Sequence, residues 1–291
     1  MSSINIIIIV ILVFILFWGM NNIFFKTNII YDKMCEAAKT IPTGTSLANI
    51  TSSNENVILA KDIPEITSSN FMLSVWFYID NWGQYISREK NILYVANSPN
   101  SLTAPGLPEN LSGLSTMVKI PSPTANVVIL PKNINIALDK FENNLFIDIE
   151  CFPDKVADEG KTIYTRYKIP NIPVQKWNNL TISVDTRTLD VYLDGKLRNS
   201  FIMHGLYKNY YDTVTLTKNI YLGNINTTAS NIGFEGFVTR IRYIGNSINP
   251  QEAYNIYKEG INASLINTLY NKYSLKVSFL EYKTEKASFQ I

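Results

Sequence analysis

Two acidic residues in one short segment are the first groups in this sequence that could do chemistry. Asp148 and Glu150 stand two residues apart in FIDIECF, and on a β-strand that spacing places both side chains on one face. A retaining glycosidase needs such a pair about 5 Å apart, as acid and nucleophile. The pair is equally well explained as exposed carboxylates on the polar side of a half-buried strand. We favour this second interpretation.

Other catalytic groups are scarce. His204, in FIMHGLY, is the only histidine, so a Ser-His-Asp or Cys-His scheme would depend on it, and no nucleophile motif stands near it. The two cysteines, Cys35 and Cys151, match no zinc spacing, and a structural zinc site needs four ligands. We expect no catalytic residue, no metal and no cofactor. We expect the cysteines to be unpaired thiols, with a single disulfide as the alternative in an oxidising compartment.

Composition limits the class of protein. The chain has 291 residues and a formal net charge of +2, with Lys and Arg scattered along it. A nucleic-acid-binding domain usually gathers its basic residues into a patch, so we expect no nucleic-acid partner. The length suits one large all-β domain with an anchor and a linker.

Short strands that alternate apolar and polar residues must position the acidic pair. FMLSVWFYID alternates from Phe71 to Ile79, which predicts a strand in a sandwich interior. NINIALDKFENNLFIDIE and LTISVDTRTLDVYLDGKL each predict a hairpin. NPQEAYNIYKEG predicts the one good soluble helix, with Asn249 as N-cap and Pro250 at its first position. Residues 97–132, rich in Pro, Ser and Asn, are interpreted as a surface insertion.

The N-terminal segment predicts a membrane anchor. Every residue from Ile6 to Met20 is apolar or Gly, and with the apolar residues that follow the run can cross a bilayer as a helix. We assign residues 1–26 to this transmembrane anchor and 27–60 to a Ser/Thr/Asn-rich spacer. The lysines that follow the apolar run place the large domain on the cytosolic side. Five Asn-x-Ser/Thr sequons would be glycosylation acceptors on a lumenal domain: Asn49, Asn110, Asn179, Asn226 and Asn262.

The segments in this order resemble the concanavalin A-like, or laminin-G-like, jelly-roll superfamily. The resemblance rests on FMLSVWFYI, VQKWNNLTISVD, VYLDGKL, IYLGN, GFEGFVTRIRYI and NPQEAYNIYKEG. It implies a mainly β fold, an antiparallel sandwich of two stacked sheets with six or seven strands each, over residues 61–262. A C-terminal β tail, residues 263–291, follows. Glycoside hydrolases of this family carry a further Glu two residues before the Asp of the pair, where this chain has Phe146, so we expect no enzyme.

The whole architecture, with an N-terminal anchor, a spacer, one jelly roll and a β tail, resembles membrane-anchored virion proteins of large DNA viruses. That resemblance implies a structural protein, a minor capsid component that ties an inner viral membrane to the capsid. Its partners would be the lipid bilayer and capsid proteins, with the large domain on the capsid-facing side.

A carbohydrate-binding, lectin-like module displayed on a membrane is the alternative function, with glycans as partners. Jelly rolls bind sugars through exposed aromatic and polar side chains, often with calcium. Asp80, Asp212 and Asn224 could ligate calcium but form no dense acidic loop. Trp76 and Trp177 are interpreted as core residues. The candidate interaction surface consists of Tyr207, Tyr210 and Tyr211 in GLYKNYYD, for a protein or a sugar.

Overall fold

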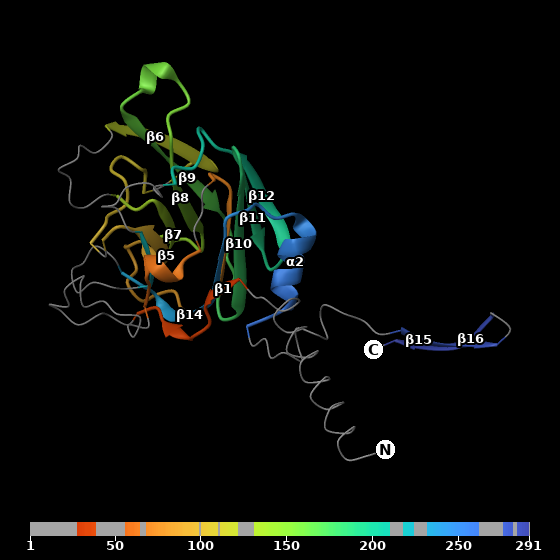
Figure 1. Cartoon of the computed structure of the whole chain (residues 1–291). Helices are drawn as coiled ribbons and strands as arrows, with labels where there is room; N and C mark the ends of the chain where they lie inside the picture. The colour runs from red at the N-terminus through yellow and green to blue at the C-terminus, as the bar shows by residue number, and fades with distance from the viewer. Residues whose placement is uncertain are drawn as a thin grey trace, which may run out of the picture.

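The computed structural model describes residues 28–38, 56–64, 68–98, 100–109, 111–121, 131–209, 218–223, 232–261, 276–281 and 284–290. Within these ranges the chain is mainly β, and two antiparallel sheets of seven strands each form a sandwich (Figure 1). This confirms the predicted mainly β sandwich of two antiparallel sheets, and seven strands per sheet lie within the predicted six or seven. A separate pair of strands lies in the C-terminal tail.

The first sheet contains seven strands, and β2 pairs with β14 beside the main order β1-β14-β4-β10-β11-β12. Their bounds are β1 (Ile29–Tyr31), β2 (Cys35–Glu36), β4 (Phe71–Asn81), β10 (Trp177–Asp185), β11 (Thr188–Leu193), β12 (Lys196–Ile202) and β14 (Glu235–Ile244).

The second sheet has the order β3-β13-β5-β7-β8-β9-β6. Its strands are β3 (Val57–Ile58), β5 (Lys90–Ala96), β6 (Ser115–Pro121), β7 (Ile134–Leu138), β8 (Leu145–Cys151), β9 (Lys161–Ile169) and β13 (Asn219–Leu222). Two short 3-10 turns are η2 (Ala60–Asp62) and η3 (Val156–Asp158). The hairpin in the C-terminal tail consists of β15 (Lys276–Glu281) and β16 (Thr284–Gln290).

The core lies between the two sheets and follows the predicted alternation. On β4, Phe71, Leu73, Val75, Phe77 and Ile79 are all buried in it. Because successive strand residues point to opposite faces, these five side chains share the inner face. Both predicted hairpins form, as β7 with β8 and as β10 with β11.

Helix α2 (Pro250–Lys258) covers part of the outer face of the first sheet. As predicted, Asn249 is its N-cap, and a reciprocal hydrogen bond with Glu252 completes a capping box. The ring of Tyr257 stacks on Trp76 of β4 with centroids 5.7 Å apart. The β11–β12 turn approaches the helix so closely that a Cβ at Gly195 would stand 2.8 Å from the Cβ of Tyr257.

Several predicted segments differ from the structure. The spacer proposed for residues 27–60 contains β1, β2 and β3, which pair with the sandwich. Strands of two or three residues show too few alternations to be recognised in a sequence. The insertion proposed for residues 97–132 contributes β6, the edge strand next to β9.

The predicted membrane anchor, residues 1–26, lies outside the described residues. In the part of the chain that the structure describes, no helix combines the length and apolar character needed to cross a bilayer.

Candidate functional site

A row of polar residues crosses the outer face of the second sheet. The strand register places Asn135 of β7 opposite Asp148 of β8, and Asp148 opposite Arg166 of β9. Their six chain neighbours are all buried, and all but Thr165 belong to the hydrophobic core, so alternation turns these three side chains away from it. All three are buried nonetheless. Some other part of the chain must therefore cover this face.

The segment from residue 100 to 109 provides this cover. The backbone N–H of Lys132 donates to the carbonyl of Leu102 at 2.9 Å, and Arg166 Nη1 donates to the carbonyl of Pro108 at 2.9 Å. Ala104 of the same segment is buried. The segment interpreted from sequence as a surface insertion thus shields the polar row from solvent.

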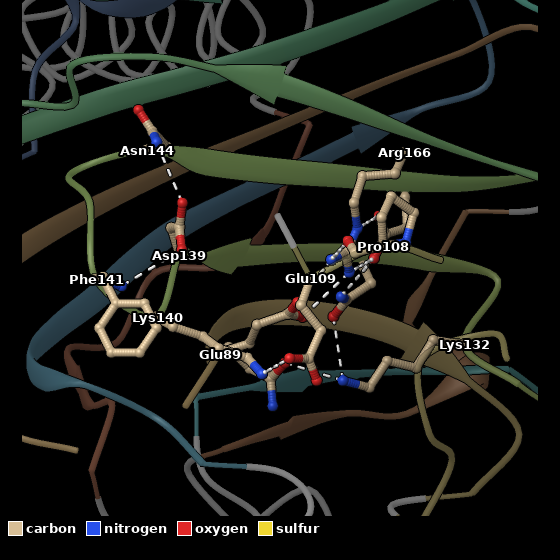
Figure 2. A network of polar contacts seen from close by, with 12 residues as sticks. Glu89, Pro108, Glu109, Lys132, Asp139, Lys140, Phe141, Asn144 and Arg166 are labelled. Atoms are coloured by element: carbon tan, nitrogen blue, oxygen red, sulfur yellow. Dashed lines mark hydrogen bonds and ion pairs between the residues drawn. The ribbon is translucent and has the colours of Figure 1, made fainter. Parts of the chain in front are cut away.

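Arg166 is the centre of the buried network (Figure 2). Its Nε and Nη2 donate to the two carboxylate oxygens of Asp148 at 2.7 and 2.8 Å. Its Nη1 and Nη2 also donate to Glu89 at 2.6 and 3.1 Å. Burial alone would lower the pKa of Arg166, but the charge of Asp148 and the hydrogen bonds to Asp148 and Glu89 outweigh it and raise that pKa above its ordinary value. The guanidinium is therefore permanently charged and fully engaged.

Lys132 extends the network from the other end. Its ammonium donates to the side-chain oxygens of Asn91 at 2.9 Å and Asn135 at 3.2 Å, and it lies 4.5 Å from the centroid of the Tyr94 ring. Only 3% of Lys132 is exposed. Burial is the main cause that lowers its pKa from 10.5 to about 7, while the negative charge of Asp148 opposes the shift.

A pocket of about 370 Å³ opens between this network and the covering segment. Its wall combines charged and neutral polar groups with a few apolar ones: Ser87, Arg88, Glu89, Asn91, Thr103, Ala104, Leu107, Glu109, Lys132, Lys140, Arg166 and Ile232. Across it, Lys140 and Glu109 form an ion pair at 2.5 Å, which lowers the pKa of the Glu109 carboxyl.

Two exposed apolar residues are adjacent in sequence to residues that line this pocket. Ile86 precedes the pocket residue Ser87 and Phe141 follows the pocket residue Lys140, and the two loops meet where Ser87 N–H donates to the Lys140 carbonyl. Phe141 is 58% exposed and Ile86 57%. A mainly polar pocket with a few apolar lining residues, such as Leu107 and Ile232, suits a small ligand that has both hydroxyl groups and an apolar face.

The acidic pair is not exposed, which corrects the interpretation from sequence. Asp148 and Glu150 are each 2% exposed. Glu150 accepts from Asn133 Nδ2 at 2.9 Å and pairs with Lys208 at 3.4 Å. Both lie on the outer face of β8, as predicted, but chain segments cover that face and fixed partners hold both carboxylates.

The structure also corrects the interpretation of Tyr207 as part of an exposed interaction surface. Tyr207 is 2% exposed and packs in the core, where its ring lies 4.6 Å from that of Phe71. Its hydroxyl donates to Asn133 Oδ1. Tyr207 therefore does not belong to an exposed surface, because its bridge to Cys151 draws it into the second sheet. Tyr210 and Tyr211 lie outside the described residues.

The other singled-out residues form no site. His204 is exposed, with Nδ1 3.4 Å from Thr165 Oγ1. Cys35 and Cys151 are both buried, and no disulfide joins them. Burial raises the pKa of the Cys151 thiol to about 12. Trp76 is buried beneath α2 rather than between the sheets, and Trp177 is half-buried against Tyr78.

The calcium candidates are not brought together. Asp80 is exposed at the end of β4, and Asp212 and Asn224 lie outside the described residues. Within the described ranges, no three His, Cys, Asp or Glu side chains gather as a metal site would require.

Sequence reasoning missed most of the residues that form the pocket, above all Glu89, Lys132 and Arg166. One signal was present in the sequence. Arg166 stands in the middle of TIYTRYKI, and a charge inside an apolar strand is rarely left buried without a partner. The register of β8 with β9 supplies that partner as Asp148.

No protein-family model matches the chain, and no curated protein matches it. Solved structures with some similarity include the receptor-binding domain of a botulinum neurotoxin C/D mosaic serotype, at 14% identity and a TM-score of 0.40. The match covers 66% of this chain and 37% of that one.

Two further structures are similar at the same level. Domain 4 of an extracellular arabinanase from Geobacillus stearothermophilus, solved with arabinotriose, is 14% identical at a TM-score of 0.37, covering 66% of this chain and 68% of that one. A Ruminococcus gnavus IT-sialidase domain, solved with α2,3-sialyllactose, is 10% identical at a TM-score of 0.40, covering 65% and 83%. At these scores the matches add nothing to the fold, which rests on strand pairing, or to the function.

Proposed function

We propose that the chain is a non-enzymatic binding protein that takes a carbohydrate ligand in the pocket on the outer face of its second sheet. The observation that carries the proposal is the pocket itself, where hydrogen-bonding groups such as Asn91 and Thr103 line a concave wall together with apolar residues such as Leu107. Sugars present hydroxyl groups at their edges and C–H groups on their faces, so they suit such a wall.

The absence of hydrolysis is part of the proposal. A glycosidase needs one carboxylic acid and one carboxylate free to meet the substrate. Here both Asp148 oxygens accept from Arg166, and Glu150 accepts from Asn133 while it pairs with Lys208. Carboxylates held in this way stabilise the cover over the sheet and are not available to a sugar.

We also propose that the chain belongs to the concanavalin A-like superfamily and that its predicted anchor spans a membrane. The apolar run from Ile6 to Met20 would hold the sandwich at a membrane surface, where its pocket meets glycans or glycan-bearing partners. The lysines after the run favour the cytosolic side, whereas glycan binding fits the lumenal or extracellular side better. Membrane topology therefore separates this role from the protein-binding role.

The test is a binding measurement with the full-length chain. Thr103→Trp would place a large ring in the pocket while it leaves the residues of the Arg166 network unchanged. It should abolish binding of the oligosaccharides, neutral or acidic, that a glycan array identifies as ligands of the wild type. Thr188→Trp is the matched control, since Thr188 is exposed on β11 of the other sheet. Equal binding by both variants would rule out the pocket as the site.

A protein-binding role is the second candidate, and an exposed apolar patch favours it. Phe152 and Val156 follow β8, and Ile202 and Leu206 follow or end β12; all four are exposed, Val156 at 87%. The two segments lie side by side, because Phe152 N–H donates to the Leu206 carbonyl at 2.8 Å. Such a patch is typical of a protein contact.

In that role the protein would tie an inner viral membrane to a capsid, as the architectural resemblance implies. Detergent extraction of the full-length chain should then bring capsid subunits with it, and Ile202→Glu should release them. Co-purification that is indifferent to Ile202→Glu would remove the patch from this account.

A further inference from the structure

The charges that line the pocket do not balance, and the surplus is positive. Four lining residues are cationic, namely Arg88, Lys132, Lys140 and Arg166, and two are acidic, namely Glu89 and Glu109. Asp148 lies behind the wall as a third carboxylate that Arg166 binds. Four cations against three carboxylates leave one net positive charge.

The pairing inside the pocket shows which cations are left over. Glu89 is bound by Arg166 at 2.6 Å, and Glu109 is bound by Lys140 at 2.5 Å. Arg88 is exposed, and its guanidinium contacts no carboxylate among the described residues. Lys132 donates only to neutral amide oxygens and has no carboxylate within ion-pair distance in the described part of the chain. Arg88, and Lys132 in its protonated form, therefore lack a counter-ion in this pocket among the described residues.

Lys132 is the more informative of the two. Burying an ammonium costs free energy unless a negative group compensates it. Its three N–H bonds meet two oxygen acceptors, Asn91 Oδ1 and Asn135 Oδ1, and the Tyr94 ring lies 4.5 Å away. A ligand oxyanion would be a stronger partner for the third donor than the ring face. An oxyanion in the pocket would accept this bond and meet the guanidinium of Arg88 at the mouth.

We infer that the ligand carries an oxyanion, a carboxylate, sulfate or phosphate on a sugar, that binds between Lys132 and Arg88. The inference deepens the proposed carbohydrate function and rests on it for the sugar part of the ligand. Charge-assisted hydrogen bonds to an oxyanion are stronger than those to a neutral hydroxyl. The acidic group should therefore dominate the affinity.

Glucose and glucuronate make a matched pair of probes, because they differ only in the carboxylate. We expect the full-length chain to bind glucuronate about ten- to a hundred-fold more tightly than glucose in calorimetric titrations. Glucose sulfate and glucose phosphate, titrated alongside, identify which oxyanion fits best. Arg88→Gln should remove most of the preference for glucuronate over glucose. Because Arg88 is exposed, we expect this variant to fold like the wild type.

Lys132→Gln, the second variant, should also remove the preference for glucuronate over glucose. Thermal unfolding checks that this variant is folded. Lys196→Gln, an exposed cation on β12, is the control and should leave the preference unchanged. Equal affinity for glucose and glucuronate would overturn the oxyanion site while the sugar pocket stands. Binding of inorganic sulfate without either sugar would support the oxyanion site and remove the carbohydrate. No binding of any probe would overturn both.

Discussion

Asp148 on β8 and Arg166 on β9 stand opposite each other in register, and two hydrogen bonds of 2.7 and 2.8 Å join the carboxylate to the guanidinium. Arg166 is 1% exposed and also holds Glu89. Removal of the guanidinium would leave two carboxylates near the pocket floor without their cation.

Arg166→Met should therefore destabilise the full-length chain by about 3–5 kcal/mol, the usual cost of leaving a buried charge without its partner. Urea denaturation of wild type and variant measures it. Lys168→Met, on the same face of β9 but in an exposed pair with Glu142, is the control and should cost less than about 1 kcal/mol. Similar losses of unfolding free energy in Arg166→Met and Lys168→Met would contradict the buried charge network around Arg166.

Asp148→Asn combined with Glu150→Gln should lower stability and change no catalytic activity. The wild-type chain should hydrolyse no β-glucan or other oligosaccharide, because both carboxylates are buried with fixed partners. Reducing-sugar release over a panel of glycans measures this. Hydrolysis by the wild type that the double variant abolishes would restore the enzyme hypothesis.

Stability should depend on pH through Lys132. The folded protein gives up this proton near pH 7, whereas the unfolded chain keeps it up to about 10.5. The unfolded state thus binds more protons in that window, and stability rises with pH there.

The difference in unfolding free energy between wild type and Lys132→Met should increase from about pH 7 toward 10.5, by at most ~1.4 kcal/mol per pH unit. The comparison isolates Lys132 because all other titrating groups are common to both proteins. A constant difference over this range would show that the pKa of Lys132 is close to its ordinary value.

Gly195→Ala should destabilise the chain by about 1–3 kcal/mol, since the new Cβ would meet Tyr257 and the backbone of Tyr254 in α2 at a residue with φ of +71°. Gly113→Ala is the matched control, because nothing lies within 4 Å of its Cβ position and its φ is not positive. Thermal unfolding of the two variants measures the effect. Equal melting temperatures would mean that α2 does not dock on the β11–β12 turn.

The topology is tested on native membranes. If residues 1–26 span the bilayer, alkaline carbonate should leave the full-length chain in the membrane, and deletion of these residues should release it. On the cytosolic side, protease should reach the sandwich.

Thiol labelling needs denaturant, because Cys35 and Cys151 are buried. Asn179 is buried, and its side-chain amide donates to Ser74 Oγ, so this sequon is not accessible in the folded domain. A change in gel mobility after glycosidase treatment would therefore report glycans at the other sequons. A protected, glycosylated domain would place the pocket on the lumenal side.

Alternation in the sequence predicted the long strands and the inner face well. Phe71 to Ile79 has the expected period, and both hairpins and the cap at Asn249 form where their residues indicate. The outer faces were harder to predict. Asp148 and Tyr207 were expected at the surface, yet both are buried, because burial there depends on which distant segment lies over a strand.

The candidate site was largely hidden for the same reason. Lys132, Glu89 and Arg166 come from three separate segments that the strand order brings together. A single sequence shows local period but not which strands become neighbours. The charge of Arg166 inside an apolar strand was the one local sign of a buried ion pair.

The most direct test of the account is an NMR titration of the full-length chain in detergent with glucuronate and glucose. We predict that chemical-shift changes concentrate on the pocket residues Arg88, Asn91 and Thr103, that glucuronate produces them at lower concentration, and that the sugar remains intact. Changes confined to the apolar patch around Ile202, or no change with either sugar, would contradict the proposal that this pocket binds a carbohydrate.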